Sequence, residues 1–187
     1  MTATQRRAQV AERSARCNPR NTTVIVSCYG FDPVDSTEFL QAALDSGARK
    51  VIVPPMCDDS FADCPTSQST GDHRWITLPL HLRSNQVVIF ESGVQVWAKR
   101  WEYTAHGDSV LNIEQVSNVD IIGYGALISM HKADYANHSV AGTCVKGAGV
   151  PCVYSKAEWR MCINMIEATN VSIAGLTVSS SGGDQGC

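Results

Sequence analysis

Asp184 is the carboxylate that this sequence places best for chemistry. It follows Gly182 and Gly183, and two glycines let the backbone turn tightly while the next side chain faces outward. A carboxylate held at such a turn can bind a ligand or act as a general acid or base. The alternative is a turn aspartate that accepts a hydrogen bond from its own backbone.

Glu158 and Arg160 form a second candidate pair, on either side of Trp159 at the start of a predicted strand. Because side chains alternate along a strand, both charged groups are expected to point outward and Trp159 to point the other way. The pair could then bind a polar ligand. The alternative is a surface ion pair, which is common and weak.

A third candidate is a polar cluster shortly after residue 130, made of His131, Lys132, Asp134 and Tyr135. These side chains could line the wall of a groove, with Tyr135 or Trp101 offering an aromatic ring. The alternative is a solvated loop.

The elements that must position these residues follow from a repeat. Residues 111–123 and 163–175 share one pattern 52 positions apart, in which apolar and polar residues alternate around an asparagine corner and end at glycine. Alternation with period two predicts strands with one buried face, and repeated strand pairs are typical of a β-solenoid. A third corner stands at Asn85. The repeat predicts three stacked pairs, which are Asn118 with Asn170, Leu111 with Ile163, and Ile121 with Ile173.

The region before the repeats predicts three further elements. An amphipathic helix is expected over residues 35–46, with Asp35 as N-cap, and a short buried strand over residues 50–53. Residues 75–83 alternate as a strand does, with a break at Pro79, which cannot donate a ladder hydrogen bond. The residues of this strand expected to face one way are Ile76, Leu78, Leu80 and Leu82.

Two segments are expected, an N-terminal tail over residues 1–30 and one domain over residues 31–187. The first twenty residues carry five arginines and one glutamate, which suits a disordered tail, a targeting leader or a start site placed too far downstream. The helix over residues 35–46 could cover the first coil of a solenoid. No later segment could cover the last coil, so the domain is expected to be truncated at its C-terminal end.

These elements together resemble pectin-lyase-like proteins, a superfamily of right-handed parallel β-helices. The motifs that carry the resemblance lie, in chain order, at residues 35–37, 40–44, 51–55, 78–85, 90–94, 123–128, 158–161 and 181–184. The resemblance implies an all-β fold, a right-handed parallel β-helix with an N-terminal capping helix. The sequence departs from the family pattern after Asp184, where an aromatic residue usually follows Gly-Gly-Asp-Gly.

The resemblance also implies activity on a polysaccharide, by hydrolysis or elimination at glycosidic bonds. Hydrolysis needs two carboxylates across the bond, and elimination needs a base with a group that neutralises the substrate carboxylate. The implied catalytic residues are Asp184 and Glu158, and the implied substrate-binding residues are Arg160, Lys132, Asp134 and Tyr135. Two alternatives stay open, a non-catalytic carbohydrate-binding or structural β-helix and a fragment of a longer enzyme.

The cysteines favour an oxidising compartment, since eight are many for a cytosolic chain of this size. Two local pairs could staple loops, Cys57 with Cys64 and Cys144 with Cys152. Glycosylation sequons at Asn21 and Asn137 also favour secretion, although no apolar signal core is present. The alternative is an intracellular chain with free thiols.

The charge and hydropathy of the chain restrict the kinds of partner that it is expected to bind. A net charge of −3 without an extended basic run disfavours nucleic acid as partner. No apolar run approaches the length of a membrane span. No metal or cofactor is expected, although Asp58, Asp59 and Asp63 could offer oxygen ligands to Ca²⁺ without the spacing of an EF-hand.

Overall fold

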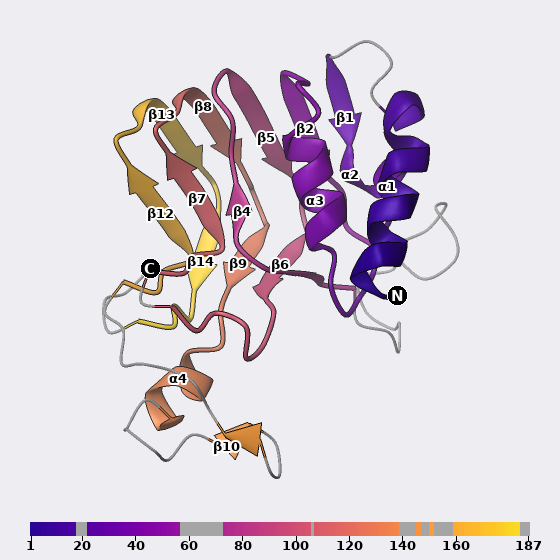
Figure 1. Ribbon diagram of the computed structural model, residues 1–187. Helices are drawn as coiled ribbons and strands as arrows, with labels where there is room; N and C mark the ends of the chain where they lie inside the picture. Colours follow the sequence, from indigo (N-terminus) through magenta and orange to yellow (C-terminus); the bar gives the residue numbers. More distant parts are fainter. Residues whose placement is uncertain are drawn as a thin grey trace.

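The computed structural model describes residues 1–17, 22–56, 73–105, 107–138, 145–146, 150–151 and 159–183. The structure contains three parallel sheets, and two of its helices, α1 (Ala3–Cys17) and α3 (Thr37–Leu44), stand beside the strands β1 (Thr23–Ile25) and β2 (Lys50–Val53) (Figure 1). A further helix, α4 (Lys132–His138), lies near the lower end of β9 in the same view.

Each sheet gathers strands from distant parts of the sequence. The five-stranded sheet contains, in spatial order, β1 (Thr23–Ile25), β2 (Lys50–Val53), β5 (Gln86–Phe90), β8 (Ser117–Ile122) and β13 (Thr169–Ala174). The four-stranded sheet contains β14 (Thr177–Ser179), β9 (Leu127–Ser129), β6 (Gln95–Ala98) and β3 (Trp75–Thr77). The three-stranded sheet contains β12 (Ile163–Ile166), β7 (Leu111–Glu114) and β4 (Leu80–His81). A separate antiparallel pair joins β10 (Val145–Lys146) and β11 (Val150–Pro151).

The 52-residue repeat sets the register between neighbouring strands. Leu111 pairs with Ile163 in the three-stranded sheet, and Ile121 pairs with Ile173 in the five-stranded sheet. Both pairings were predicted from the repeat and are confirmed. Equivalent residues therefore stack at equivalent positions along neighbouring parallel strands.

An asparagine ladder joins the corners of successive repeats. The Nδ2 of Asn170 donates to Oδ1 of Asn118 at 2.7 Å, and the Nδ2 of Asn118 donates to Oδ1 of Asn85 at 2.9 Å. All three residues have a positive φ, between 52° and 62°, a conformation that asparagine tolerates better than most residues. The predicted stack of Asn118 over Asn170 is confirmed and extends to Asn85.

The predicted fold class, an all-β right-handed parallel β-helix, is wrong for this structure. Helix accounts for 22% and strand for 34% of the part of the chain that the structure describes, and the three parallel sheets are stacked rather than closed into a solenoid. The repeat pattern fixes which strands pair, but strand pairing alone does not specify how sheets close around an axis. The helix content was underestimated because residues 3–17 are mostly polar and contain one large aliphatic residue, Val10, so the sequence indicated a tail where the structure has a helix.

Three helices form the N-terminal part of the structure, α1 (Ala3–Cys17), α2 (Val26–Tyr29) and α3 (Thr37–Leu44). The helix predicted over residues 35–46 is confirmed as α3, and the short strand predicted over residues 50–53 is confirmed as β2. The disordered tail expected at the start of the chain is wrong, because α1 occupies most of it. Its Arg6 is buried and makes ion pairs with both Asp32 and Asp35 at 3.0 Å.

The N-cap of α3 also differs in detail from the prediction. Ser36 occupies the cap position, whereas Asp35 lies one residue earlier and accepts hydrogen bonds from the backbone N–H and the hydroxyl of Thr37. Asp35 thereby still satisfies a donor in the first turn of the helix.

The break predicted at Pro79 is confirmed, since it separates β3 from β4. The prediction of which side chains face the core is correct only after the break, where Leu80 and Leu82 are buried. Before it, Thr77 is buried and Ile76 is half-buried. The irregular residues between the two strands change the phase of the alternation, so one pattern cannot describe both sides.

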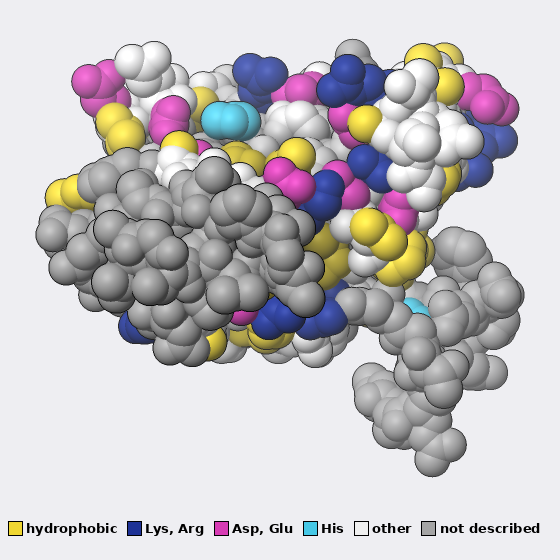
Figure 2. Space-filling view, turned by 60° about the horizontal axis from the view of Figure 1, so that its bottom comes forward, with side chains coloured by type: hydrophobic (Ala, Val, Ile, Leu, Met, Phe, Trp, Pro, Cys, Tyr) yellow, Lys and Arg dark blue, Asp and Glu magenta, His cyan; other side chains and the backbone are white. Residues whose placement is uncertain are grey.

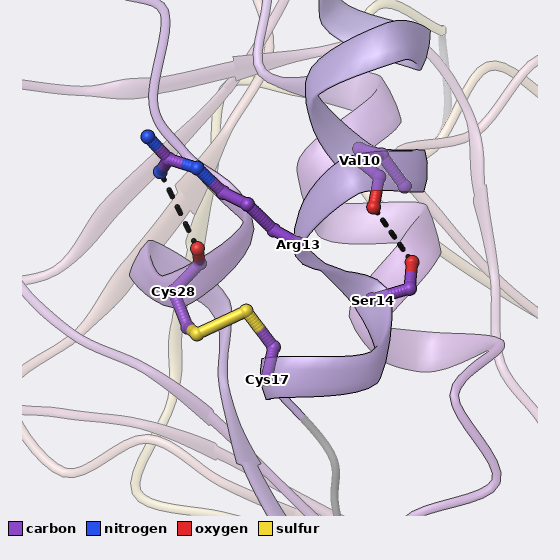
Figure 3. The surroundings of a disulfide bond; sticks show 5 residues. All are labelled: Val10, Arg13, Ser14, Cys17 and Cys28. Atoms are coloured by element: carbon purple, nitrogen blue, oxygen red, sulfur yellow. Dashed lines mark hydrogen bonds between the residues drawn. A yellow bond between two sulfur atoms is a disulfide. The ribbon is translucent and has the colours of Figure 1, made fainter.

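One disulfide joins Cys17, at the end of α1, to Cys28 in α2 (Figure 3). A guanidinium nitrogen of Arg13 donates to the backbone oxygen of Cys28 at 3.4 Å in the same region. The expectation of disulfide bonding is confirmed in general terms, although this pair was not the one predicted. All four cysteines of the predicted pairs lie outside the described residues.

Candidate functional site

A groove with a volume of about 500 Å³ crosses the four-stranded sheet near the ends of β3 and β6. Three of its lining residues are cations, Arg74, Lys99 and Arg100. Arg74 comes directly before β3, and the other two follow β6 directly. In the parallel pairing of β3 with β6, Ile76 lies opposite Trp97, so Arg74 and the two later cations lie toward opposite ends of this strand pair. We call this groove the cationic groove.

Trp97 is the platform of the cationic groove. The guanidinium of Arg74 lies over its ring, 5.1 Å from the centroid, and the imidazole of His131 packs against it with ring centroids 5.0 Å apart. The indole N–H donates to the side-chain oxygen of Gln95 at 3.2 Å. Stacking on a half-buried indole restricts the motion of the Arg74 guanidinium and orients its N–H groups.

Lys99 is held from beneath by a buried carboxylate. Its Nζ lies 3.0 Å from Oδ2 of Asp35, whose side chain is only 5% exposed while that of Lys99 is 28% exposed. Burial alone would raise the pKa of Asp35, but hydrogen bonds from Thr37 and Lys99 outweigh it and lower this pKa. Asp35 is therefore ionised at neutral pH and keeps the Lys99 ammonium at the groove.

Arg100 is arranged in the same way. Its Nε lies 3.0 Å from Oδ2 of Asp134, and the arginine side chain is 58% exposed against 12% for the carboxylate. In both pairs the cation therefore lies on the solvent side and the carboxylate is covered. Figure 2, which brings the lower side of Figure 1 forward, shows Lys and Arg side chains interspersed with Asp and Glu on this face.

His131 completes the polar lining of the groove. It lies between β9 and α4 and is half-buried. Burial lowers its pKa, and the nearby positive charge of Arg100 lowers it further. The imidazole is consequently neutral at neutral pH, with one nitrogen that donates and one that accepts a hydrogen bond.

The apolar part of the groove lining is formed by Val34, Ile76 and Ala98. Val34 is exposed and precedes α3, whereas Ala98 is buried at the end of β6. The lining of the groove thus combines hydrogen-bond donors with aliphatic groups.

The cluster predicted after residue 130 is divided by the structure. His131 lines the groove, Asp134 holds Arg100 in place, and Lys132 is exposed at the first position of α4. Tyr135 is buried, with the guanidinium carbon of Arg160 4.6 Å from its ring centroid. Tyr135 therefore packs inside the protein and does not offer its ring to a ligand in the groove.

Arg160 has a structural position. It is buried and donates hydrogen bonds to the backbone oxygens of Ala105, at 3.2 Å, and Gly182, at 3.4 Å. Trp159, by contrast, is exposed. The predicted outward orientation of Arg160 is wrong, because its guanidinium links chain segments and stacks on an aromatic ring instead of facing solvent.

The two predicted catalytic carboxylates, Asp184 and Glu158, lie outside the described residues, and so do the three aspartates considered for Ca²⁺. Their roles stay predictions. Within the described ranges, no group of three or more His, Cys, Asp or Glu side chains is arranged to hold a metal ion. In the same part of the chain, the helices are too short or too polar to cross a membrane.

Sequence reasoning missed the cationic groove. The available signal was the order Trp97, Ala98, Lys99 and Arg100, which sets two cations directly after a strand that carries a tryptophan. Arg74 could not be joined to them from the sequence, because its neighbourhood to Trp97 depends on the pairing of two strands.

A second groove, of about 710 Å³, lies between α3 and the strands β4 and β7. Its lining includes the ion pair of Asp45 with Arg83, 2.7 Å apart, and the exposed residues Glu114 and Gln115. Glu114 accepts a hydrogen bond from Asn164 at 2.9 Å. In this groove, carboxylates and amides face solvent.

Comparison with known proteins gives no relative: no family model, curated protein or solved structure matches the chain. The resemblance to the pectin-lyase-like superfamily stays a prediction, and function has to be argued from the grooves themselves.

Proposed function

We propose that the protein binds an acidic polysaccharide in the cationic groove. The observation that carries this proposal is the arrangement of two ion pairs, in which Lys99 and Arg100 lie outward and their carboxylate partners, Asp35 and Asp134, are covered. A ligand in the groove meets the cations first. Charge-assisted hydrogen bonds from such groups to a carboxylate are stronger than neutral ones.

The shape of the groove favours a saccharide over a small inorganic anion. A pyranose ring carries aliphatic C–H groups on its faces and polar groups at its edge, so it suits a lining that includes the apolar Val34 and Ile76, the aromatic Trp97 and several hydrogen-bond donors. A volume of about 500 Å³ falls within the range of sites that hold small organic ligands.

Polymeric acid is also favoured over nucleic acid by the overall charge. The chain has a net charge of −3, whereas proteins that bind nucleic acid usually carry a basic face that contacts many phosphates. A short row of three cations suits a ligand with widely spaced charges, such as one carboxylate per sugar residue.

Cleavage of the bound polysaccharide is a separate hypothesis. It depends on Asp184 and Glu158, since the carboxylates of Asp35 and Asp134 are already engaged by cations. Product analysis by chromatography would test it. If the protein releases oligosaccharides and Asp184→Asn or Glu158→Gln stops the release, the groove serves an enzyme; if neither variant matters, those residues are not catalytic.

Isothermal titration calorimetry with hexuronate oligomers of several linkages, each beside a neutral oligomer of equal length, tests the binding proposal. We expect at least one acidic oligomer to bind and its neutral counterpart to bind about tenfold more weakly or not at all. Arg74→Gln should weaken acidic binding by a similar factor. Equal affinity for acidic and neutral oligomers, or an Arg74→Gln variant that binds like the wild type, would contradict the proposal.

A further inference from the structure

We propose that anion binding in the cationic groove is coupled to the uptake of one proton by His131, so that the groove binds its ligand more tightly in mildly acidic solution. The inference rests on the proposed function for the identity of the ligand. It adds a regulation of the same site by pH.

The position of His131 makes it a member of the site. Its ring packs on Trp97, the residue over which Arg74 also lies. Because Arg74 and His131 also line the same groove, an anion that occupies the groove lies near both side chains.

The charges around His131 come from every element that forms this end of the groove. They are Arg74 before β3, Lys99 and Arg100 after β6, and Lys132 and Asp134 in α4. Asp134 is paired with Arg100 and Asp35 with Lys99. A third carboxylate, Glu102, lies 3.9 Å from Lys99, so among the described residues four cations stand against three carboxylates at this end of the groove.

These surroundings explain why His131 is neutral when the groove is free. Burial lowers its pKa most and the charge of Arg100 lowers it next, whereas Asp134 and a hydrogen bond with the Ala98 backbone raise it, and Arg74 lowers it by the smallest of these effects. A bound carboxylate would offset the charge of the two arginines and favour the protonated form. Ligand binding should consequently raise the pKa of His131.

The direction of the pH dependence follows from linkage. Between the lowered pKa of the free protein and the raised pKa of the complex, each binding event takes up a proton. Affinity then increases as pH falls through this interval, by at most about tenfold per pH unit for one proton. Below the pKa that His131 has in the free protein, the imidazole is protonated in both the free protein and the complex. Affinity then no longer changes with pH.

The ligand and the other cations do not titrate in this interval. Carboxyl groups have ordinary pKa values near 3 to 4, so they stay ionised above about pH 5, and lysine and arginine stay charged up to about pH 9. A pH dependence between about pH 5 and pH 8 thus reports on histidine. His81, which lines the second groove, provides the matched control.

The test is calorimetric titration of the tightest acidic oligomer at several pH values between about 5 and 8, in pairs of buffers with different ionisation enthalpies. We expect the wild type to take up close to one proton on binding within this interval. Its affinity should fall about tenfold as pH rises across the interval. His131→Gln should bind with a nearly constant affinity, and His81→Gln should behave as the wild type.

Two results would overturn the inference. One is an affinity of the wild type that does not change with pH, and the other is a His131→Gln variant that keeps the full pH dependence. If no oligosaccharide binds at all, the proposed function fails, but the coupling can still be tested with inorganic sulfate. Sulfate titration should raise the pKa of His131 followed by NMR; an unchanged pKa under saturating sulfate would overturn the coupling.

Discussion

The two grooves can be compared through one ion pair in each. Arg100–Asp134 lies at the cationic groove and Arg83–Asp45 at the second groove. The two arginines are almost equally exposed, at 58% and 62%, and each lies within 3.0 Å of its aspartate. Their partners differ, because the side chain of Asp134 is 12% exposed and that of Asp45 is 39% exposed. The same pair of residue types therefore offers a ligand mainly a cation in one groove and both charges in the other.

The difference teaches that the charge offered by a groove depends on which member of each pair is covered. The second groove also has the exposed carboxylate of Glu114, so Arg83 is offset by two acidic groups. In the cationic groove, the acidic groups are buried under the cations that they position. Each of the two ion pairs has a net charge of zero, so the charge of the pair alone would not separate the two grooves.

The largest effect is expected from neutralising a buried carboxylate. Asp35→Asn removes the carboxylate that Arg6 and Lys99 share and leaves Arg6 with Asp32 alone, and the loss of one member of a buried pair costs about 3 to 5 kcal/mol. The equivalent change in the second groove, Asp45→Asn, breaks an exposed pair and should cost less than about 1 kcal/mol. Urea unfolding monitored by circular dichroism measures both, and similar losses in the two variants would remove the distinction between covered and exposed partners.

The next effect on stability concerns helix α1, whose Arg6 shares the carboxylate of Asp35 with Lys99 of the cationic groove. Cys17 and Cys28 are 11 positions apart, and the loss of a crosslink of this length removes about 3 kcal/mol in the chain-entropy model. The Cys17→Ser/Cys28→Ser variant should therefore unfold at lower urea concentration than the wild type.

A second readout shows whether the disulfide also supports the groove. Because α1 carries Arg6 to Asp35, hydrogen exchange in the serine variant should increase in α1 and around Asp35 while β4 and β7 of the second groove stay protected. Uniformly increased exchange in both grooves would show that the disulfide stabilises the molecule as a whole and not this side of it.

A smaller effect on stability is expected at low pH. Hydrogen bonds from Thr37 and Lys99 overcome the effect of burial and lower the pKa of Asp35 in the folded protein. Its contribution to stability is complete above the ordinary pKa of an aspartate, near 4, and disappears as pH falls through the lowered value. Asp35→Asn should therefore flatten the loss of stability between about pH 4 and pH 2, and an unchanged acid profile would contradict the assignment.

The sequence was most informative where one residue type has one physical role. Asn118 and Asn170 were predicted to stack because asparagine tolerates positive φ and its amide can both donate and accept, and the ladder confirms this. Helix α3 and strand β2 were likewise predictable from apolar periodicity.

Properties that depend on distant contacts could not be predicted in this way. Alternation alone indicated that Arg160 points outward, but its burial depends on Tyr135 and on backbone oxygens far along the chain. The cationic groove depends on the pairing of β3 with β6, and the closure of the sheets cannot be read from the repeat. Local geometry could therefore be predicted from the sequence. Which member of each ion pair is exposed could not.

The most direct test of the cationic groove is a comparison of Arg100→Gln with Arg83→Gln by isothermal titration calorimetry with the tightest acidic oligomer. Both changes remove one arginine of similar exposure from an ion pair, so the effects on net charge are equal. We expect Arg100→Gln to weaken binding about tenfold, since Asp134 loses its cation and then repels the ligand, and Arg83→Gln to leave the affinity within about twofold of the wild type. Equal losses in the two variants, or a larger loss in Arg83→Gln, would contradict the assignment of the ligand to the cationic groove.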